Sequence, residues 1–306
     1  MARYILFRFF QGVICIIGAS VIIFIASRAS GDVTLLLLPP DATDEQIEIM
    51  RSEIGLDKPL YTQYFMFAGK ALKGDFGKSY RWEMPALELV TDRFPATIQL
   101  ALCALAFSIT TALFFGVLSA VYQGSWFDKF GKIFALLGQA MPGFWVGLMF
   151  ILLFAVKLGW LPAFGRGGFR HLILPSVTLG WYSVAAQTRM VRSAMLDVLD
   201  SDYIKTARGV GVPRRILIWK YALRNAAVPL VTMLGVYFAA MLGGSFIIET
   251  IFAWPGVGRT VVEAIFARDY PVVQAGVLFT SIFFVFSNLL VDLTYGLIDP
   301  RIRYVR

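Results

Sequence analysis

The segment DSDYIKTARGVGVPRRILIWKYALRNA, residues 200–226, separates two long apolar stretches and is itself basic, with glycines and a proline inside it. Ser201 or Asp202 is a candidate N-cap of a short helix that ends at the glycines up to Gly211. Pro213 suits the first turn of a second helix. The sequence therefore predicts two short helices joined by a bend, placed between the two apolar stretches.

The apolar stretches on either side are long enough to cross a membrane. Of the 306 residues 58% are hydrophobic, whereas soluble domains average about 45–50%. A run of roughly 18 or more apolar residues crosses a hydrocarbon core of about 30 Å as a helix. We predict six spans, at residues 9–28, 97–122, 133–157, 172–195, 227–251 and 273–298. The predicted fold is an all-α polytopic membrane protein with six transmembrane helices.

The distribution of lysine and arginine predicts the orientation of these spans, because short loops rich in them stay cytoplasmic. With both termini inside, the side that carries residues 200–226 holds fifteen basic residues against five acidic ones. The opposite side holds thirteen basic residues against fourteen acidic ones. We therefore expect both termini in the cytoplasm. The net charge of +8 reflects this orientation, and no basic and aromatic pattern typical of nucleic-acid binding accompanies it.

The stretch between the first two spans, residues 30–96, is too long for a simple turn and is expected to form a small external helical cap. Thr43 and Gln46 have capping-box spacing, and Gly55 follows where that helix ends. Asp57 is expected to cap a second helix. Four of its residues are expected to line one packed face, namely Leu60, Tyr64, Phe67 and Leu72.

Several patterns that suggest catalysis or nucleotide binding are incomplete. The stretch GDFGKSY has Leu72 where a phosphate-binding loop needs its first glycine, and GVGVPR has Arg214 where a dinucleotide fingerprint needs its third. Cys15 and Cys103 fall within predicted spans without metal-binding spacing. We predict no catalytic, cofactor-binding or metal-binding residue.

Three polar residues in or near the last two spans are candidates for a translocation path. Asp292 lies well inside the sixth span, Asn288 one turn before it on the same face, and Glu249 closes the fifth span. Charged groups within a membrane are costly and commonly functional. The alternative for Asp292 is an ion pair with an arginine of the C-terminal tail, and the alternative for Glu249 is contact with water.

The segment RSAMLDVLDSDYIKTARGVG…ALRNAAVP resembles the EAA-type coupling loop of ABC importer permeases of the dipeptide, oligopeptide and nickel family. Further stretches resemble the same family in order and spacing, so that the likeness covers nearly the whole chain. These stretches are IGLDKPLYTQY, GDFGKS, RFPATIQL, GSFIIETIFAWPGVGR, RDYPVVQAGVL and VDLTYGLIDPRIRY.

The chain departs from the family pattern at three places. Ser30 to Val33 replace the usual proline-glycine-aspartate-proline turn. Gly209 and Val210 replace the usual alanine-lysine pair. Lys205 stands where the general permease motif begins with glutamate, as this branch of the family allows.

The resemblance implies a type I ABC importer permease of the bacterial inner membrane, forming half of a translocation pathway. The implied partners are a homologous second permease, two cytoplasmic ATPase subunits, an external solute-binding protein and the lipid bilayer. ATP hydrolysis then belongs to the partners, so the chain is expected not to be an enzyme and to need no cofactor. Four parts are predicted: 1–29, the N-terminus and first span; 30–96, the external cap; 97–298, a five-span core with the coupling loop at about 196–225; and 299–306, a cytoplasmic tail.

The resemblance also assigns the contact with the ATPase to the first half of residues 200–226. The residues implied are Asp202, Tyr203, Lys205, Thr206, Ala207, Arg208 and Gly211. Ala207 and Gly211 are small and lie four residues apart. We interpret them as a notch in the helix surface at which the ATPase can make close contact. The alternative is that this basic segment rests on anionic lipid.

Two other classes of protein remain as alternatives. A secondary transporter driven by protons or sodium would use carboxylates in the membrane, and only Asp292 and Glu249 are available. An intramembrane enzyme would need a nucleophile with a base, or a metal cluster. Within the permease family, dipeptides, oligopeptides, glutathione and nickel all remain as substrates. We favour peptides because the spans lack the histidine and thiolate clusters that suit metals.

Overall fold

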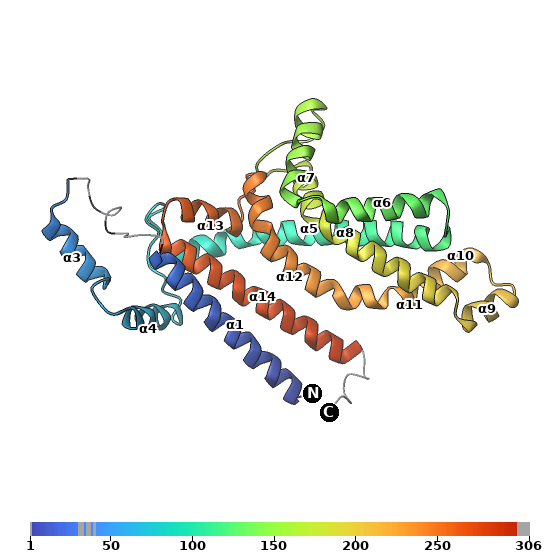
Figure 1. The fold of residues 1–306 in the computed structure, drawn as a ribbon, viewed down its shortest axis with the longest axis horizontal. Helices are drawn as coiled ribbons and strands as arrows, with labels where there is room; N and C mark the ends of the chain where they lie inside the picture. The colour runs from blue at the N-terminus through green and yellow to red at the C-terminus, as the bar shows by residue number, and fades with distance from the viewer. Residues whose placement is uncertain (1, 30–33, 35–37, 39–40, 299–306) are drawn as a thin grey trace. The chain divides into compact units, whose positions relative to one another are not determined.

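The computed structural model describes residues 2–29, 34, 38 and 41–298 (Figure 1). These residues are helical apart from turns and one isolated β-bridge, between Lys78 and Pro85, which confirms the all-α prediction. The chain forms two compact units. The first contains Met1–Thr97 and Pro255–Phe286, and the second contains Ile98–Trp254 and Ser287–Arg306. Residues 255–286, predicted to belong to the core 97–298, therefore cluster with the N-terminal residues.

The first unit begins with α1 (Ala2–Ala29) and the two helices α3 (Asp44–Ile54) and α4 (Leu60–Ala71). The capping box predicted at the start of α3 is present, because Thr43 and Gln46 each accept a backbone N–H of the other. Gly55 ends α3 in the left-handed conformation, as predicted.

The helix α4 differs from its prediction at the cap and along its packed face. Its N-cap is Pro59 and carries no side-chain hydrogen bond, so the predicted cap at Asp57 is corrected. Tyr64 and Phe67 pack against the ring of Phe24 in α1, as expected of the packed face. The other two residues predicted for that face, Leu60 and Leu72, are exposed.

The rest of the first unit consists of the N-terminal part of α5 (Ala86–Val121), α13 (Val257–Phe266) and most of α14 (Tyr270–Ile298). Phe94 of α5 packs against Phe279 and Phe283 of α14, with ring centroids 4.9 Å and 4.1 Å away. The hydroxyl of Thr97 accepts the backbone N–H of Val257, which holds the start of α13 on α5.

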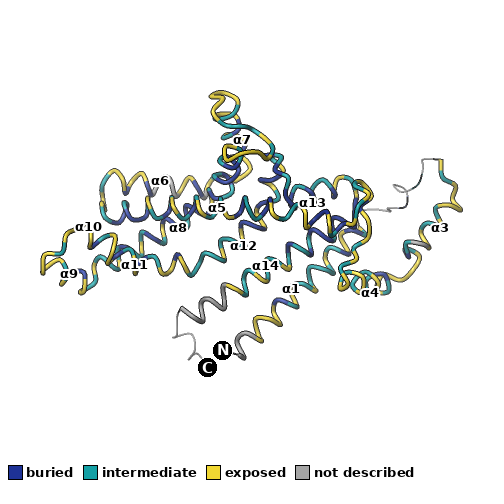
Figure 2. The backbone as a smooth tube through the Cα atoms, turned by 180° about the vertical axis from the view of Figure 1, so that it is seen from behind, coloured by how far each residue is buried: buried dark blue, intermediate teal, exposed yellow. Residues whose placement is uncertain are grey.

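The second unit is arranged around the long helix α8 (Phe169–Leu199), which packs against α6 (Trp126–Ala140), α7 (Gly143–Phe150) and α12 (Val228–Ile251). Figure 2 shows buried positions along α8. Its buried side chains include several polar ones, namely Ser176, Thr178, Ser183, Gln187 and Thr188. The helix is thus enclosed by protein along much of its length.

Four described helices are long and apolar enough to cross a membrane, within Leu6–Ala29, Ala86–Val121, Val228–Ile251 and Tyr270–Leu290. A fifth span results if Trp126–Gly138 and Gly143–Lys157 count as one broken span, although they bend by 108°. The bend falls at Pro142, and a residue before proline is turned away from helical geometry. By this measure of length and apolar composition, the described residues contain four of the six predicted spans, or five with the broken pair. The span predicted at 172–195 is α8, whose polar residues are enclosed by neighbouring helices and lower its hydropathy.

Candidate coupling surface

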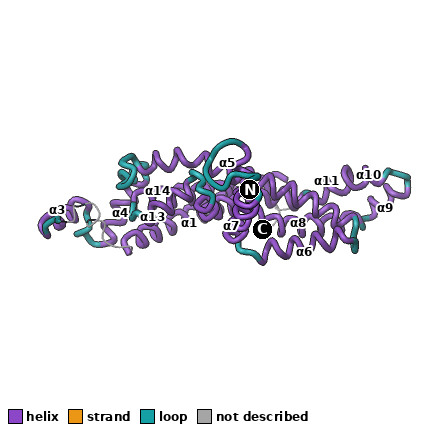
Figure 3. Tube along the Cα trace, turned by 90° about the horizontal axis from the view of Figure 1, so that it is seen from above, coloured by secondary structure: helices purple, strands orange, loops and turns teal. Residues whose placement is uncertain are grey.

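The predicted coupling segment folds as α9 (Asp202–Gly209), a turn, and α10 (Arg214–Ile216), followed by a π-helical segment Leu217–Ala222 and α11 (Leu223–Ala226) (Figure 3). The backbone around Gly211 forms a Schellman motif: the N–H of Val212 donates to Ala207 and the N–H of Gly211 donates to Arg208. Gly211 has φ of 85°, which L-residues avoid. Pro213 precedes the second helix, as predicted.

One buried residue fixes α9 to the rest of the second unit. Ile204 is fully buried in an apolar cluster formed by four helices and the π-helical segment. The other members are Val117, Ala120, Val191, Met195, Leu217, Ala222, Ala226 and Leu230. A displacement of α9 therefore acts directly on α5, α8, α11 and α12, because packed interiors yield little.

The opposite face of α9 is exposed and polar. Exposed side chains at Asp202, Tyr203, Lys205, Thr206 and Arg208 surround the buried Ile204. The polar face is thus exposed on this chain, whereas the apolar face packs against the chain's own cluster.

Two local contacts order the polar face. Lys205 pairs with Asp200 at 3.0 Å, and both side chains are exposed, so this ion pair adds little stability. The hydroxyl of Tyr203 accepts a hydrogen bond from the amide of Asn225 at 2.8 Å, which joins α9 to α11.

The predicted notch at Ala207 and Gly211 stays a prediction, and its two residues have different surroundings. Ala207 is half-buried and packs against the chain's own apolar cluster. A Cβ added at Gly211 would meet nothing within 4 Å, so no fitted contact of this chain surrounds it. The glycine is explained by the left-handed turn that ends α9.

A buried ion pair next to this cluster was not foreseen from the sequence. Asp128 in the first turn of α6 is 1% exposed and accepts two hydrogen bonds from the guanidinium of Arg192 in α8, at 2.9 and 3.2 Å. Ser119 of α5 donates to the same carboxylate at 2.5 Å, and so does the N–H of Gly124 at 3.1 Å. The carboxylate thus joins α5, α6 and α8.

The three polar residues proposed for a translocation path lie in different surroundings. Glu249 is fully buried in α12, which corrects the alternative that it faces water. Asn288 is half-buried in α14. Asp292 also lies in α14, but its side chain and the arginines of the tail fall outside the described residues.

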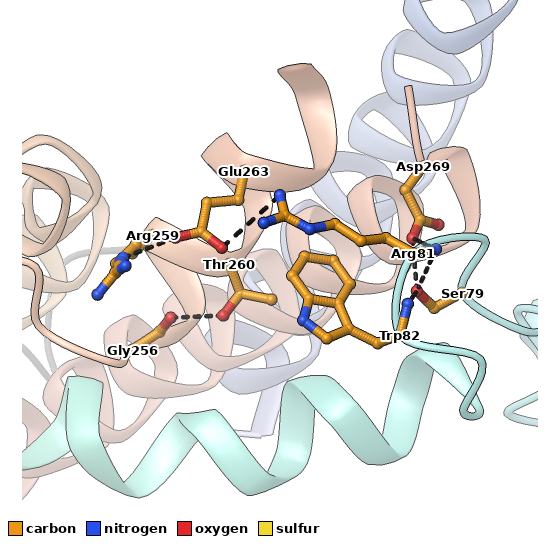
Figure 4. A network of polar contacts seen from close by, with 8 residues as sticks. All are labelled: Ser79, Arg81, Trp82, Gly256, Arg259, Thr260, Glu263 and Asp269. Atoms are coloured by element: carbon orange, nitrogen blue, oxygen red, sulfur yellow. Dashed lines mark hydrogen bonds and ion pairs between the residues drawn. The ribbon is translucent and has the colours of Figure 1, made fainter. Parts of the chain in front are cut away.

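The first unit contains a second polar network, shown in Figure 4, at the corner between α13 and α14. The buried carboxylate of Asp269 accepts the hydroxyl of Ser79 at 2.5 Å and the N–H of Arg81 at 3.1 Å. Arg259 pairs with Glu263 at 2.7 Å along α13. These contacts hold the turn before α5 against the start of α14.

The same turn carries a perturbed tyrosine. Burial raises the pKa of Tyr80, the charge of Asp269 raises it further, and Arg28 lowers it. Tyr80 is therefore neutral at physiological pH and acts as a hydroxyl group.

Among the described residues, no group of histidine, cysteine, aspartate or glutamate side chains is placed to hold a metal ion.

Comparison with known proteins gives a consistent result over the whole chain. Residues 112–304 match the family described as "Binding-protein-dependent transport system inner membrane component", and residues 1–101 match its N-terminal component. The glutathione transport system permease protein GsiC of Escherichia coli (strain K12) is 38% identical over 99% of this chain and 100% of that protein. GsiC of Shigella boydii serotype 4 (strain Sb227) is 37% identical with the same coverage.

A solved structure shares the fold. It is titled "Crystal structure of an amino acid ABC transporter with histidines", and the match has a TM-score of 0.52 at 16% sequence identity. The match covers 68% of this chain and 92% of that chain.

Proposed function

Because the chain belongs to the family of binding-protein-dependent transport system inner membrane components, permease subunits of ABC importers, we propose that it imports small peptides and that α9 receives the push of a cytoplasmic ATPase. The relatives named for glutathione, a tripeptide, support a peptide substrate. The proposed assembly contains a homologous second permease, two ATPase subunits and an external solute-binding protein. The chain itself carries no ATPase activity in this proposal.

The observation that carries the coupling role is the two-faced arrangement of α9. Its polar face, with Tyr203, Thr206 and Arg208, is exposed, while Ile204 on the other face is enclosed by residues of α5, α8, α11 and α12. When ATP closes the ATPase dimer, a force on the exposed face passes through Ile204 into these helices. The helices then turn and open the pathway towards a loaded binding protein, and hydrolysis resets them.

Substitutions on the polar face of α9 can distinguish a contact with the ATPase from simple attachment of this segment to lipid. Thr206→Phe and Arg208→Glu change exposed side chains of α9 and leave the buried cluster intact. Lys220→Glu is the matched control, because Lys220 is exposed in the same basic segment but lies outside α9. The proposal expects lost co-purification of the ATPase and lost peptide uptake in the α9 variants, with normal membrane levels.

The control separates the two interpretations. If the segment only rests on anionic lipid, Arg208→Glu and Lys220→Glu should weaken its binding alike, because each replaces a positive charge with a negative one. Normal ATPase co-purification and uptake in both α9 variants would overturn the coupling role. Uptake of labelled dipeptide and glutathione by the complete importer, with nickel as a competitor, tests the substrate class.

A further inference from the structure

The helix α4 packs on the membrane-crossing part of α1. The rings of Tyr64 and Phe67 lie 5.6 and 5.8 Å from the ring of Phe24, measured between centroids. The hydroxyl of Tyr64 lies 2.8 Å from the hydroxyl of Ser20, deeper along α1. The contact thus involves side chains inside the predicted span and not only its end.

The depth of this contact follows from helix geometry. Between Arg8 and Arg28 the chain has no charged residue, and this stretch is about 28 Å long as a helix, close to the thickness of a hydrocarbon core. Arg28 then lies at one boundary of the core. Phe24 is four residues inward, about 6 Å below that boundary, and Ser20 is about 12 Å below it. Interfacial amphipathic helices insert to similar depths, roughly 5–10 Å.

The outward face of α4, which is part of the predicted external cap, is apolar. Leu60, Tyr61 and Phe65 are 63%, 68% and 70% exposed. Lys58, before α4, and Lys70, in its last turn, are basic residues near its two ends. Aromatic and basic residues in this arrangement are typical of helices at a lipid surface.

A pocket of about 550 Å³ lies between the two helices. Among the described residues that line it, Arg28 is the one that carries a charge and the others are apolar or aromatic: Val21, Phe24, Ile25, Arg28, Ala29, Leu60, Tyr61 and Tyr64. A phospholipid matches this chemistry, because its acyl chain suits the apolar walls and its phosphate suits a guanidinium at the membrane boundary.

We propose that α4 lies in the membrane interface and that α1 and α4 hold a phospholipid, with an acyl chain between Ile25 and Tyr61 and the phosphate at Arg28. The occupant is a lipid of the leaflet at the Arg28 end of α1. This inference is independent of the peptide substrate and of the coupling role of α9.

The first test measures contact with acyl chains in the assembled importer. A bimane label is attached at Tyr61→Cys or Phe65→Cys in a background with Cys15→Ala and Cys103→Ala, and the complex is placed in nanodiscs whose acyl chains carry bromine. The labels are expected to lose fluorescence to the same extent as a label at Ile25→Cys, which lines the pocket on α1. A label at Glu45→Cys, exposed in α3, is expected to keep its fluorescence.

The outcomes are distinct. Unquenched labels at both Tyr61→Cys and Phe65→Cys would overturn the proposal and indicate that another subunit covers this face. Labels at Tyr61→Cys and Phe65→Cys that are quenched no more than the label at Glu45→Cys would also overturn it, since the outward face of α4 would then be no nearer to acyl chains than an exposed residue of α3.

The second test concerns the phosphate. Phospholipid retained by the purified importer is measured by native mass spectrometry for Arg28→Gln, Arg28→Lys and the control Arg81→Gln. The proposal expects one retained phospholipid fewer in Arg28→Gln only, because lysine keeps the charge. Unchanged retention in Arg28→Gln would overturn the assignment of the headgroup.

Discussion

Gly209 and Gly211 stand two residues apart at the end of α9 but have opposite conformational requirements. Gly211 is left-handed, and a Cβ there costs about 1–2 kcal/mol. Gly209 is helical and faces open space, so alanine there should stabilise α9 by about 0.5–1 kcal/mol. We expect faster hydrogen exchange of the α9 amides in Gly211→Ala and slower exchange in Gly209→Ala. Equal effects of one sign would contradict the explanation of Gly211 given by the turn.

The carboxylate of Asp128 gives a second prediction for single residues. Asp128→Asn leaves the guanidinium of Arg192 without its buried partner, which costs about 3–5 kcal/mol. The control Asp200→Asn removes the exposed pair with Lys205 and costs less than about 1 kcal/mol. Thermal unfolding in detergent, followed by tryptophan fluorescence, should show a clear loss for Asp128→Asn alone. Comparable losses in both variants would contradict the prediction that the buried ion pair stabilises the fold more than the exposed one.

At the level of residues, local signals were predictable and distant ones were not. The capping box at Thr43 and the glycine at position 211 depend on neighbours within a few residues, and their spacing is visible in the sequence. The pair of Asp128 and Arg192 joins residues 64 apart in the chain. Nothing in the spacing of loop charges distinguishes this carboxylate from those that face water.

At the scale of one element, α9 is expected to act as a unit only while Ile204 is in place. Ile204→Ala removes a buried side chain and should cost about 2–5 kcal/mol, since a cavity remains. The helix would then move without moving α8. We expect ATPase co-purification to persist while stimulated hydrolysis no longer drives uptake.

The control for this element is Val210→Ala, because Val210 is exposed at the end of the same helix. It should leave both hydrolysis and uptake unchanged. An Ile204→Ala variant with normal uptake would show that force reaches the spans by another route.

The elements themselves were largely predictable, and the errors have a common origin. Hydropathy identified α1, α5, α12 and α14, which expose apolar side chains widely. It ranks α8 lower because several polar residues lie along this helix, and a sequence window does not contain the neighbouring helices that enclose them. It likewise missed the exposed apolar face of α4, because helical spacing alone does not say which face a neighbour covers.

For the whole molecule, the charge distribution predicts both ends and α9 on the cytoplasmic side, with the turn at Lys78 on the other side. Reporter fusions at Arg306 and at Lys78 test this, with alkaline phosphatase active outside and a fluorescent protein active inside. Fusions that both report the same side would contradict this topology.

A second prediction for the whole molecule concerns energy. The sequence lacks a phosphate-binding loop, so the purified subunit is expected to hydrolyse no ATP and to bind no nucleotide. Equilibrium binding of a fluorescent ATP analogue measures this, with the assembled importer as the positive control. Saturable binding by the isolated subunit at micromolar concentration would contradict it.

The contact between Ser79 and Asp269 joins residues 190 apart, and it has a consequence for biosynthesis. At about 5–20 residues per second, a ribosome needs roughly 10–40 s to make the chain between them. During that interval the turn before α5 exists without the carboxylate that orders it, while all residues from Ile98 to Trp254 emerge and can fold. The first unit is thus completed only near the end of translation, and until then its turn lacks the hydrogen bonds that Asp269 accepts.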